Sequence, residues 1–260
     1  MKKFVALLLA VLMVASLCAC GQKDTGSDLQ TVTKGKLIMS TNAEFAPYEY
    51  VADDGKGFQG TGYEGIDIEI AYALAQKLGL ELVVDNMDFD AALSAVQTGK
   101  SDIVAAGVTV TPERQNTMSF TDSYANGVQV VIVKEGSDIK SIDDLQGKKI
   151  GTQRGTTGFL YCSDDFGDDN VIGFDDGATA VQNLKAGKID CVVIDNVPAQ
   201  EYVKANPGLT ILDTEYANED YAIGIAKDNT ALQEALNKAL AELKADGTIQ
   251  SIIDKYIPAK

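Results

Sequence analysis

AVQTGKSDIV at residues 95–104 and LKAGKIDCVV at residues 184–193 show the same pattern in the two halves of this 260-residue chain. In each stretch a helical segment ends at a glycine, a lysine follows, and an apolar run typical of a strand comes next. A duplication and two independent uses of a common helix-to-strand turn explain the pattern equally well, because glycine at a helix end has a conformational cause. Either origin predicts two α/β lobes.

The segments around the first stretch alternate between short β-branched runs and amphipathic helices, which is typical of α/β proteins. Apolar residues recur at helical spacing from Ile66 to Leu78, and Gly79 is expected to end that helix. The other elements that we expect are strands at residues 37–39, 80–84 and 102–106, and helices at residues 89–97 and 230–245. The pattern predicts sheets that are flanked by helices.

The N-terminus has the features of a secretory signal. Lys2 and Lys3 precede an apolar run over residues 4–17, which is too short to span a bilayer comfortably but suits a signal-peptide core. The sequence that follows, LCACG at residues 17–21, resembles a bacterial lipobox. We therefore expect a signal peptide at residues 1–19.

Cys20 is the expected site of lipid attachment, because cleavage before Cys18 would put Leu17 where a small residue is preferred. Two acyl chains on Cys20 would anchor the protein to the extracellular face of the cell membrane, or to its periplasmic face in a host with an outer membrane. Residues 20–33 would then form a lipidated N-terminus and a flexible tether. The alternative is an ordinary secretory signal with incidental cysteines.

The composition narrows the range of functions. A formal net charge of −16 argues against nucleic acid as a partner. The sequence contains no histidine, which excludes Ser-His and Cys-His catalysis and removes the commonest metal ligand, so no metal or cofactor is expected. Beyond the lipobox only Cys162 and Cys191 remain, and the sequence leaves open whether they form a disulfide.

Candidate binding residues lie in loops. In open α/β sheets, ligands bind at the carboxyl ends of strands, and loops at residues 40–50, 106–114, 152–158 and 194–198 fit that description. The polar and aromatic residues of these loops, together with the nearby Phe89, are Asn42, Phe45, Tyr48, Thr109, Arg114, Gln153, Arg154, Thr156, Thr157 and Asp195.

Arg114 is one of only two arginines in the chain. Its rigid fork of N–H donors, close to Thr109, suits a carboxylate better than the point charge of lysine does. Residues 156–157 are both threonine and are expected to begin a helix, whose N–H groups favour an anion. Because Asp195 supplies the opposite charge, these residues predict a site for a zwitterion.

Each of these residues also has a structural interpretation. Taken alone, Arg114 fits a surface position at a helix start, and Asp195 fits a cap on the helix that Pro198 helps to begin. Phe45 and Phe89 are, by general burial statistics, core residues. The residues favour a binding site because they occur as a set.

Six motifs occur in a fixed order between residues 36 and 257: STNAEFAPYEY (40–50), GID (65–67), MDFD (87–90), AGVTVTPER (106–114), QRGTTG (153–158) and VIDN (193–196). In this set the chain resembles the bacterial extracellular solute-binding proteins of polar amino-acid ABC transporters. The resemblance implies the two-lobed, type II periplasmic-binding-protein-like fold. It places lobe 1 at residues 34–124 and 222–260 and lobe 2 at residues 125–221, joined by two hinge strands.

The same resemblance implies a role for each candidate residue. Two aromatic walls sandwich the ligand, one group of residues holds its α-carboxylate, an acid takes its α-ammonium, and two amides read its side chain. In that order the residues are Phe45 and Phe89; Gly107, Thr109 and Arg114 with Thr157; Asp195; and Asn42 and Gln153.

The implied function is that of a monomeric, membrane-anchored receptor that binds a free amino acid and delivers it to the permease and ATPase of an ABC importer. Relatives often carry Asp at the position of Asn42, so a neutral polar amino acid is the expected ligand. If the loop turns Glu44 inward, arginine or lysine becomes the better ligand. A cleft enzyme and a sensory domain are alternatives on the same fold, but no nucleophile-base pair and no signalling segment is visible.

Overall fold

The computed structural model describes residues 29–258. The expected signal peptide, Cys20, the first part of the tether and residues 259–260 lie outside the described residues. No helix between residues 29 and 258 has both the length and the apolar character needed to cross a membrane.

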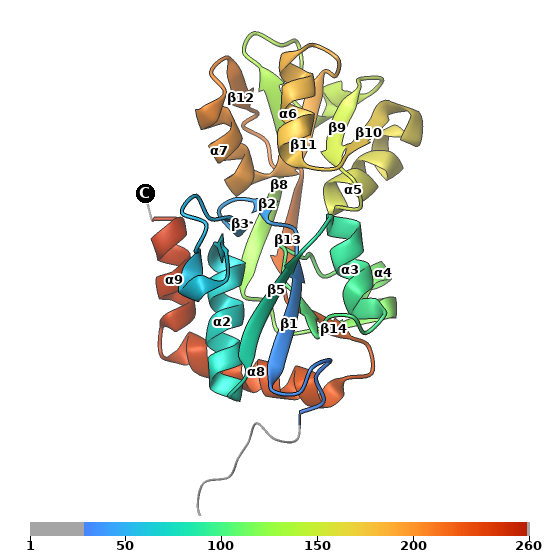
Figure 1. The fold of residues 1–260 in the computed structure, drawn as a ribbon. Coiled ribbons are helices and arrows are strands. Elements are labelled where there is room, and N and C mark those ends of the chain that lie inside the picture. Colours follow the sequence, from blue (N-terminus) through green and yellow to red (C-terminus); the bar gives the residue numbers. More distant parts are fainter. Residues whose placement is uncertain (1–28, 259–260) are drawn as a thin grey trace, which may run out of the picture.

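The first lobe is built on a five-stranded sheet in the order β5-β1-β6-β14-β7 (Figure 1). β1 runs parallel to β5 and β6, whereas β14 is antiparallel to both of its neighbours. Beside this sheet lies a small three-stranded sheet in the order β2-β3-β4. The strands of the two sheets are β1 (Lys36–Thr41), β2 (Glu44–Phe45), β3 (Glu49–Val51), β4 (Tyr63–Glu64), β5 (Glu81–Asn86), β6 (Ile103–Val104), β7 (Met118–Phe120) and β14 (Gly224–Ala226).

Five α-helices belong to this lobe. In α2 the isoleucines and Leu74 are buried at helical spacing, and the helix ends where Gly79 adopts the left-handed conformation (φ 68°). The helices are α2 (Ile66–Leu78), α3 (Phe89–Gln97), α4 (Pro112–Thr117), α8 (Thr230–Ala245) and α9 (Thr248–Tyr256), and a short 3-10 helix, η1 (Phe58–Gly60), precedes β4.

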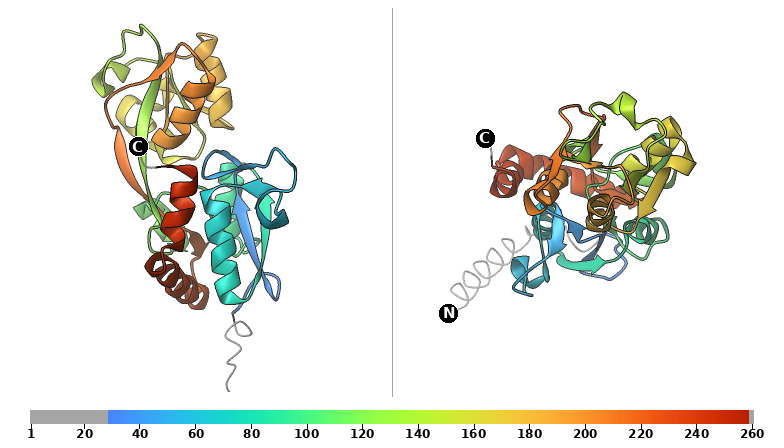
Figure 2. Two further views of the ribbon diagram at one scale, coloured as in Figure 1. Left: turned by 90° about the vertical axis from the view of Figure 1, so that its left-hand side faces the viewer. Right: turned by 90° about the horizontal axis from the view of Figure 1, so that it is seen from above.

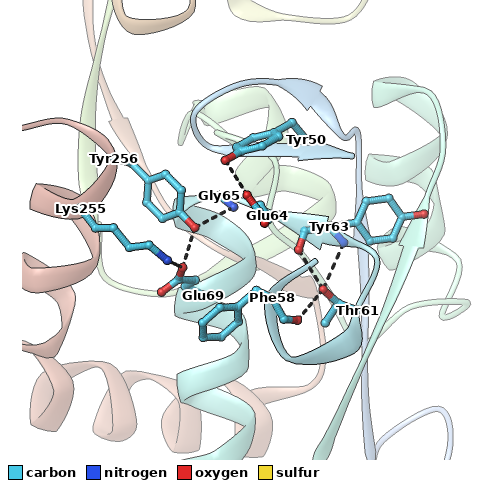
Figure 3. Close-up of polar contacts among 9 residues, drawn as sticks. All are labelled: Tyr50, Phe58, Thr61, Tyr63, Glu64, Gly65, Glu69, Lys255 and Tyr256. Carbon is cyan, nitrogen blue, oxygen red and sulfur yellow. Dashed lines mark hydrogen bonds and ion pairs between the residues drawn. The ribbon is translucent and has the colours of Figure 1, made fainter. Parts of the chain in front are cut away.

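Helix α9 returns the chain to the start of α2, beside which it lies in Figure 2. The Tyr256 hydroxyl donates to Glu69 Oε1 at 2.5 Å and accepts from Gly65 N at 3.3 Å, while the Lys255 ammonium pairs with the same Glu69 oxygen (Figure 3). Gly65 has no side chain with which to cap α2, so the Tyr256 hydroxyl from α9 accepts the Gly65 N–H just before the helix.

The second lobe contains a six-stranded sheet in the order β10-β9-β11-β8-β12, with β13 paired to the other part of β8. Its apolar strand residues and the inner faces of α6 and α7 form one core. The elements are β8 (Ala125–Lys134), η2 (Ile142–Leu145), β9 (Ile150–Gln153), α5 (Thr157–Phe166), η3 (Asp168–Asn170), β10 (Val171–Phe174), α6 (Gly177–Lys185), β11 (Cys191–Asp195), α7 (Asn196–Ala205), β12 (Leu209–Ile211) and β13 (Ala217–Tyr221).

The long strand β8 carries the chain from the first lobe into the second, and β13 brings it back (Figure 1). The two strands pair antiparallel, with Tyr221 opposite Ala125. The two strands therefore cross between the lobes side by side.

The structure differs from the sequence expectation at one strand of the first lobe. The strand expected at residues 102–106 is limited to Ile103–Val104. At its start the Asp102 carboxylate accepts the N–H of Ile38 at 2.7 Å, and after its end the backbone turns at Gly107, whose φ is 55°. The residues beyond β6 thus belong to a loop and not to the sheet.

Cys162, in α5, and Cys191, in β11, are both fully buried and are free thiols. Burial raises the pKa of Cys162 to about 12. The disulfide that the sequence left open is therefore not formed in this structure.

Candidate functional site

A cavity between the two lobes brings together all nine residues that the sequence singled out for ligand binding. Six come from the first lobe and three from the second: Asn42, Phe45, Phe89, Gly107, Thr109 and Arg114, and Gln153, Thr157 and Asp195. The other residues of the lining are Glu49, Ala106, Gln129, Thr156, Val193, Ile194 and Tyr221.

Arg114 is held in place by contacts with both lobes. The hydroxyl of Thr111 caps α4 by accepting the N–H of Arg114, and the guanidinium lies over the Phe89 ring, 5.5 Å from its centroid. Arg114 Nη1 donates to the Thr109 carbonyl at 2.8 Å, and Nη2 donates to the Gly155 carbonyl at 3.2 Å. Because a guanidinium has five N–H donors, others remain for an anion in the cavity.

The backbone at Gly107 is fixed from behind. Its N–H donates to Asp67 Oδ2 at 2.8 Å, so this amide is not available to a ligand carboxylate. A Cβ at this position would lie 3.0 Å from Phe45 Cε1 and would need the left-handed conformation (φ 55°). Because Gly107 lines the cavity with its amide occupied, we take its carbonyl as the group that it can offer to a ligand, and a carbonyl suits an ammonium and not a carboxylate.

The start of helix α5 faces the cavity from the second lobe. The Thr156 hydroxyl caps the helix by accepting the N–H of Phe159 at 3.3 Å, and Thr157 is its first residue. Its Oγ1 lies 3.5 Å from Thr109 Oγ1 in the first lobe. This helix end, with its free N–H groups and partial positive charge, lies on the same side of the site as Arg114 and favours an anion there.

Asp195, at the end of β11, is both a helix cap and a residue of the cavity lining. It caps α7 by accepting the N–H of Val197 at 3.0 Å, and its other oxygen accepts from Val128 N at 2.9 Å and from the Tyr221 hydroxyl at 2.8 Å. It also lines the cavity. Burial raises the pKa of Asp195 to about 6, against the lowering effect of these three donors.

Direct contacts join the lobes across the cavity. Gln153 Nε2 donates to Asn42 Oδ1 at 2.8 Å, and the hydroxyl of Tyr202 donates to the carbonyl of Glu44 at 3.3 Å. A Cβ on Gly155 would lie only 1.6 Å from Asp90 Oδ1, so the second lobe approaches α3 more closely than any other residue would permit. The structure is therefore the closed arrangement of the two lobes.

Glu49, which was not among the residues predicted from the sequence, lines the cavity and is only 1% exposed. Glu44, the acid that the sequence offered for the pocket, is exposed and is not part of the lining. Among the described residues, no donor forms a hydrogen bond with either Glu49 carboxyl oxygen. The position of Glu49 between two tyrosines was a local signal of its burial.

Gln129 and Tyr221 are further lining residues that the sequence analysis did not identify. Gln129 donates from Nε2 to Glu219 Oε2 at 2.9 Å, and both side chains are buried. A single amide within the apolar run at residues 128–133 was a usable signal for Gln129, because a buried polar side chain needs a partner. Two other residues of the candidate loops do not line the cavity: Tyr48 is buried beside Phe45, and Arg154 is exposed and pairs with Asp175.

A family model for "bacterial extracellular solute-binding proteins, family 3" matches residues 37–259. The chain belongs to this family. The arginine-binding extracellular protein ArtP of Bacillus subtilis (strain 168) is 34% identical over 266 residues, which cover 98% of each chain.

Solved structures of the same kind agree closely with this solute-binding protein. An ancestral arginine-binding protein bound to glutamine is 40% identical, with a TM-score of 0.80 over 87% of this chain and 100% of the other. The structure of an ancestral arginine-binding protein bound to arginine is 41% identical, with a TM-score of 0.78 over 86% of this chain and 98% of the other. The fold is that of the type II periplasmic binding proteins, as expected from the sequence.

Proposed function

We propose that this solute-binding protein captures a free amino acid in the cavity between its lobes and delivers it to the permease and ATPase of an ABC importer. The observation that carries the proposal is the separation of charge across one buried cavity. Arg114 and the start of α5 offer donors for an α-carboxylate, whereas Asp195 and the Gly107 carbonyl offer acceptors for an α-ammonium. Phe45 and Phe89 supply the apolar walls.

For the ligand side chain, the surroundings of Glu49 favour arginine or lysine over a neutral polar amino acid. A buried carboxyl group that lines a cavity without a donor is costly unless a ligand supplies one, and a guanidinium supplies two in a planar fork. The names of the arginine-binding relatives support the same choice. Glutamine is the second candidate, because the Asn42 and Gln153 amides also lie in the lining and a related ancestral protein is bound to it.

Binding is expected to close the two lobes. We take residues 34–124 and 222–260 as lobe 1 and residues 125–221 as lobe 2, with β8 and β13 as hinge strands at their junction. A ligand that starts on Arg114 reaches Thr157 and Asp195 only in the closed arrangement, so its differential affinity shifts the population toward closure. The closed form is the one that would dock on the permease.

The remaining parts of the proposal concern the setting of the protein. A signal peptide at residues 1–19 and a diacylglyceryl group on Cys20 would hold a monomeric receptor at the outer face of the cell membrane. Its role is to bind and release the ligand unchanged and not to catalyse a reaction, since the site presents a clamp of opposite charges and the sequence contains no histidine to act as a base.

A thermal-shift screen of the twenty amino acids tests the proposal, because a ligand that binds only the folded state raises the melting temperature. We expect arginine and lysine to give the largest shifts. Arg114→Lys is expected to weaken binding by about 2–4 kcal/mol, since the buried fork to the carboxylate is lost. The matched control is Arg154→Lys, at the other and exposed arginine, which is expected to bind as the parent does. No shift with any amino acid would overturn the proposal.

A further inference from the structure

We propose that the carboxyl groups of Glu49 and Asp67 share one proton in the ligand-free protein and lose it to solvent when a cationic ligand side chain enters the cavity. Binding of arginine or lysine would then be an exchange of one cation for one proton. This inference rests on the proposed function and adds to it a coupling between pH and ligand affinity.

The two acids are buried close together, and Glu49 lines the cavity: the N–H of Asp67 donates to the carbonyl of Tyr48, the residue before Glu49, at 2.9 Å. Glu49 is the first residue of β3 and Asp67 lies in the first turn of α2, and each is 1% exposed. Asp67 Oδ2 accepts the N–H of Gly107, and the Tyr124 hydroxyl faces the same carboxyl group and lowers its pKa. Both oxygens of Glu49 lack a hydrogen-bond donor in the described part of the chain. From the loop at residues 106–114, the pair thus receives the backbone amide of Gly107.

The titratable groups around the pair add no positive charge. Tyr48, which precedes β3, and Tyr124, which precedes β8, are the phenols next to both acids, and Asp195 of β11 in the second lobe lies near Tyr48. Each of these groups is a phenol or another acid. Neither Glu49 nor Asp67 takes part in an ion pair among residues 29–258. A buried pair in such surroundings does not carry two negative charges, because nothing offsets the second one.

The ionisation of the pair follows from this geometry. Burial, followed by the nearby charge of Asp67, raises the pKa of Glu49 well above that of an ordinary glutamate. The free protein therefore keeps one proton between the two carboxyl groups, and their combined charge is −1. With the proton gone and a guanidinium bound, the charges are −2 and +1, which restores the same total. The cation thus replaces the proton without any change in the net charge of the buried site.

Calorimetry with the purified full chain tests the exchange by comparing L-arginine with L-citrulline, a neutral ligand of nearly the same shape. Each is titrated near neutral pH in phosphate and in Tris, whose different ionisation heats report the number of protons released. We expect arginine to release about one proton more than citrulline, because both carry the α-ammonium that faces Asp195 but only arginine places a cation at Glu49. Equal proton release for the two ligands would overturn the inference.

Two variants separate the pair from other acids near the cavity. In Glu49→Gln, arginine is expected to release no extra proton. Its affinity should also lose the increase of up to about tenfold per pH unit that the parent shows while the pair is protonated. Glu44→Gln, at an exposed glutamate whose pKa is also raised by burial and by Asp176, is the matched control and should release as many protons as the parent. If arginine binds the parent without proton release, the inference fails and the proposed function stands; if no amino acid binds, the proposed function fails.

Discussion

Two glutamates of the first lobe, Glu49 and Glu69, are both buried, but only Glu69 has hydrogen-bond partners among the described residues. Glu69, 7% exposed, receives the Tyr256 hydroxyl and the Lys255 ammonium from α9, and Lys255 also lies 5.5 Å from the centre of the Phe58 ring (Figure 3). Glu49 receives no donor from the described chain and faces another acid and the cavity.

On the proposed function, the difference separates an acid that stabilises the fold from one that binds the ligand. A buried carboxylate with both a lysine and a tyrosine partner is satisfied when the protein folds, so it holds α9 against α2. A buried carboxyl group without a hydrogen-bond donor raises the free energy of the empty protein, and a bound cation can lower it again. On the proposed function, the unpartnered Glu49 would make the empty site less stable and would favour a ligand with a charged side chain.

The strongest test of this contrast is to replace each glutamate by glutamine. Glu49→Gln is expected to weaken arginine binding by about 2–4 kcal/mol, because the desolvated guanidinium loses its charged partner. Glu69→Gln should leave the affinity unchanged within experimental error, since its side chain is not part of the cavity lining. Isothermal calorimetry on both variants measures this, and equal losses of affinity would remove the distinction between the two acids.

A second test concerns stability and its dependence on pH. Burial raises the pKa of Asp67 to about 6 in the folded protein, above the unfolded value of about 4. The resulting stabilisation is present below pH 4 and is lost as the pH rises through 6, because the folded state then has to give up its extra proton. Asp67→Asn keeps an acceptor for the Gly107 N–H and removes this loss.

The Asp67→Asn variant without ligand is therefore expected to be more stable than the parent by about 1–2 kcal/mol at neutral pH, and no more stable at pH 4. Urea unfolding at several pH values measures the difference. A variant that is less stable than the parent at neutral pH would indicate that the acid pair stabilises the fold in the way that Glu69 does.

The smallest expected effect comes from the partners of Glu69. Tyr256→Phe removes the donor to Glu69 and the acceptor of the Gly65 N–H, and is expected to lower the free energy of unfolding by about 1 kcal/mol while arginine affinity is unchanged. Tyr72→Phe is the matched control, since the Tyr72 ring packs on Phe58 but its hydroxyl makes no hydrogen bond within residues 29–258. Equal stability of the two variants would show that the Tyr256 contacts contribute nothing.

Much of the fold could be predicted from the sequence, because its signals are local. The helical spacing from Ile66 and the glycine stop at Gly79 gave α2, and the helices predicted at residues 89–97 and 230–245 have the same limits in the structure. Helix α9 was not predicted. It is short, and its attachment depends on Glu69, which is far from it in the sequence.

The candidate site was predictable as a set of residues but not as a set of contacts. The strand-end loops included Tyr48 and Arg154, which lie outside the cavity lining, and the family resemblance selected the nine residues that share it. Local sequence could not reveal that the Gly107 amide is occupied by Asp67, or that Glu49 turns inward while Glu44 turns outward. Those facts depend on how the loop at residues 40–50 packs against α2, which involves partners distant in the sequence.

A crystal structure of the protein with L-arginine tests the central claim most directly. We expect the α-carboxylate on Arg114 and the start of α5, the α-ammonium on Asp195 and the Gly107 carbonyl, and the guanidinium within hydrogen-bond distance of the Glu49 carboxylate. An arginine whose guanidinium lies away from Glu49, with that carboxyl group still unpartnered, would contradict the account.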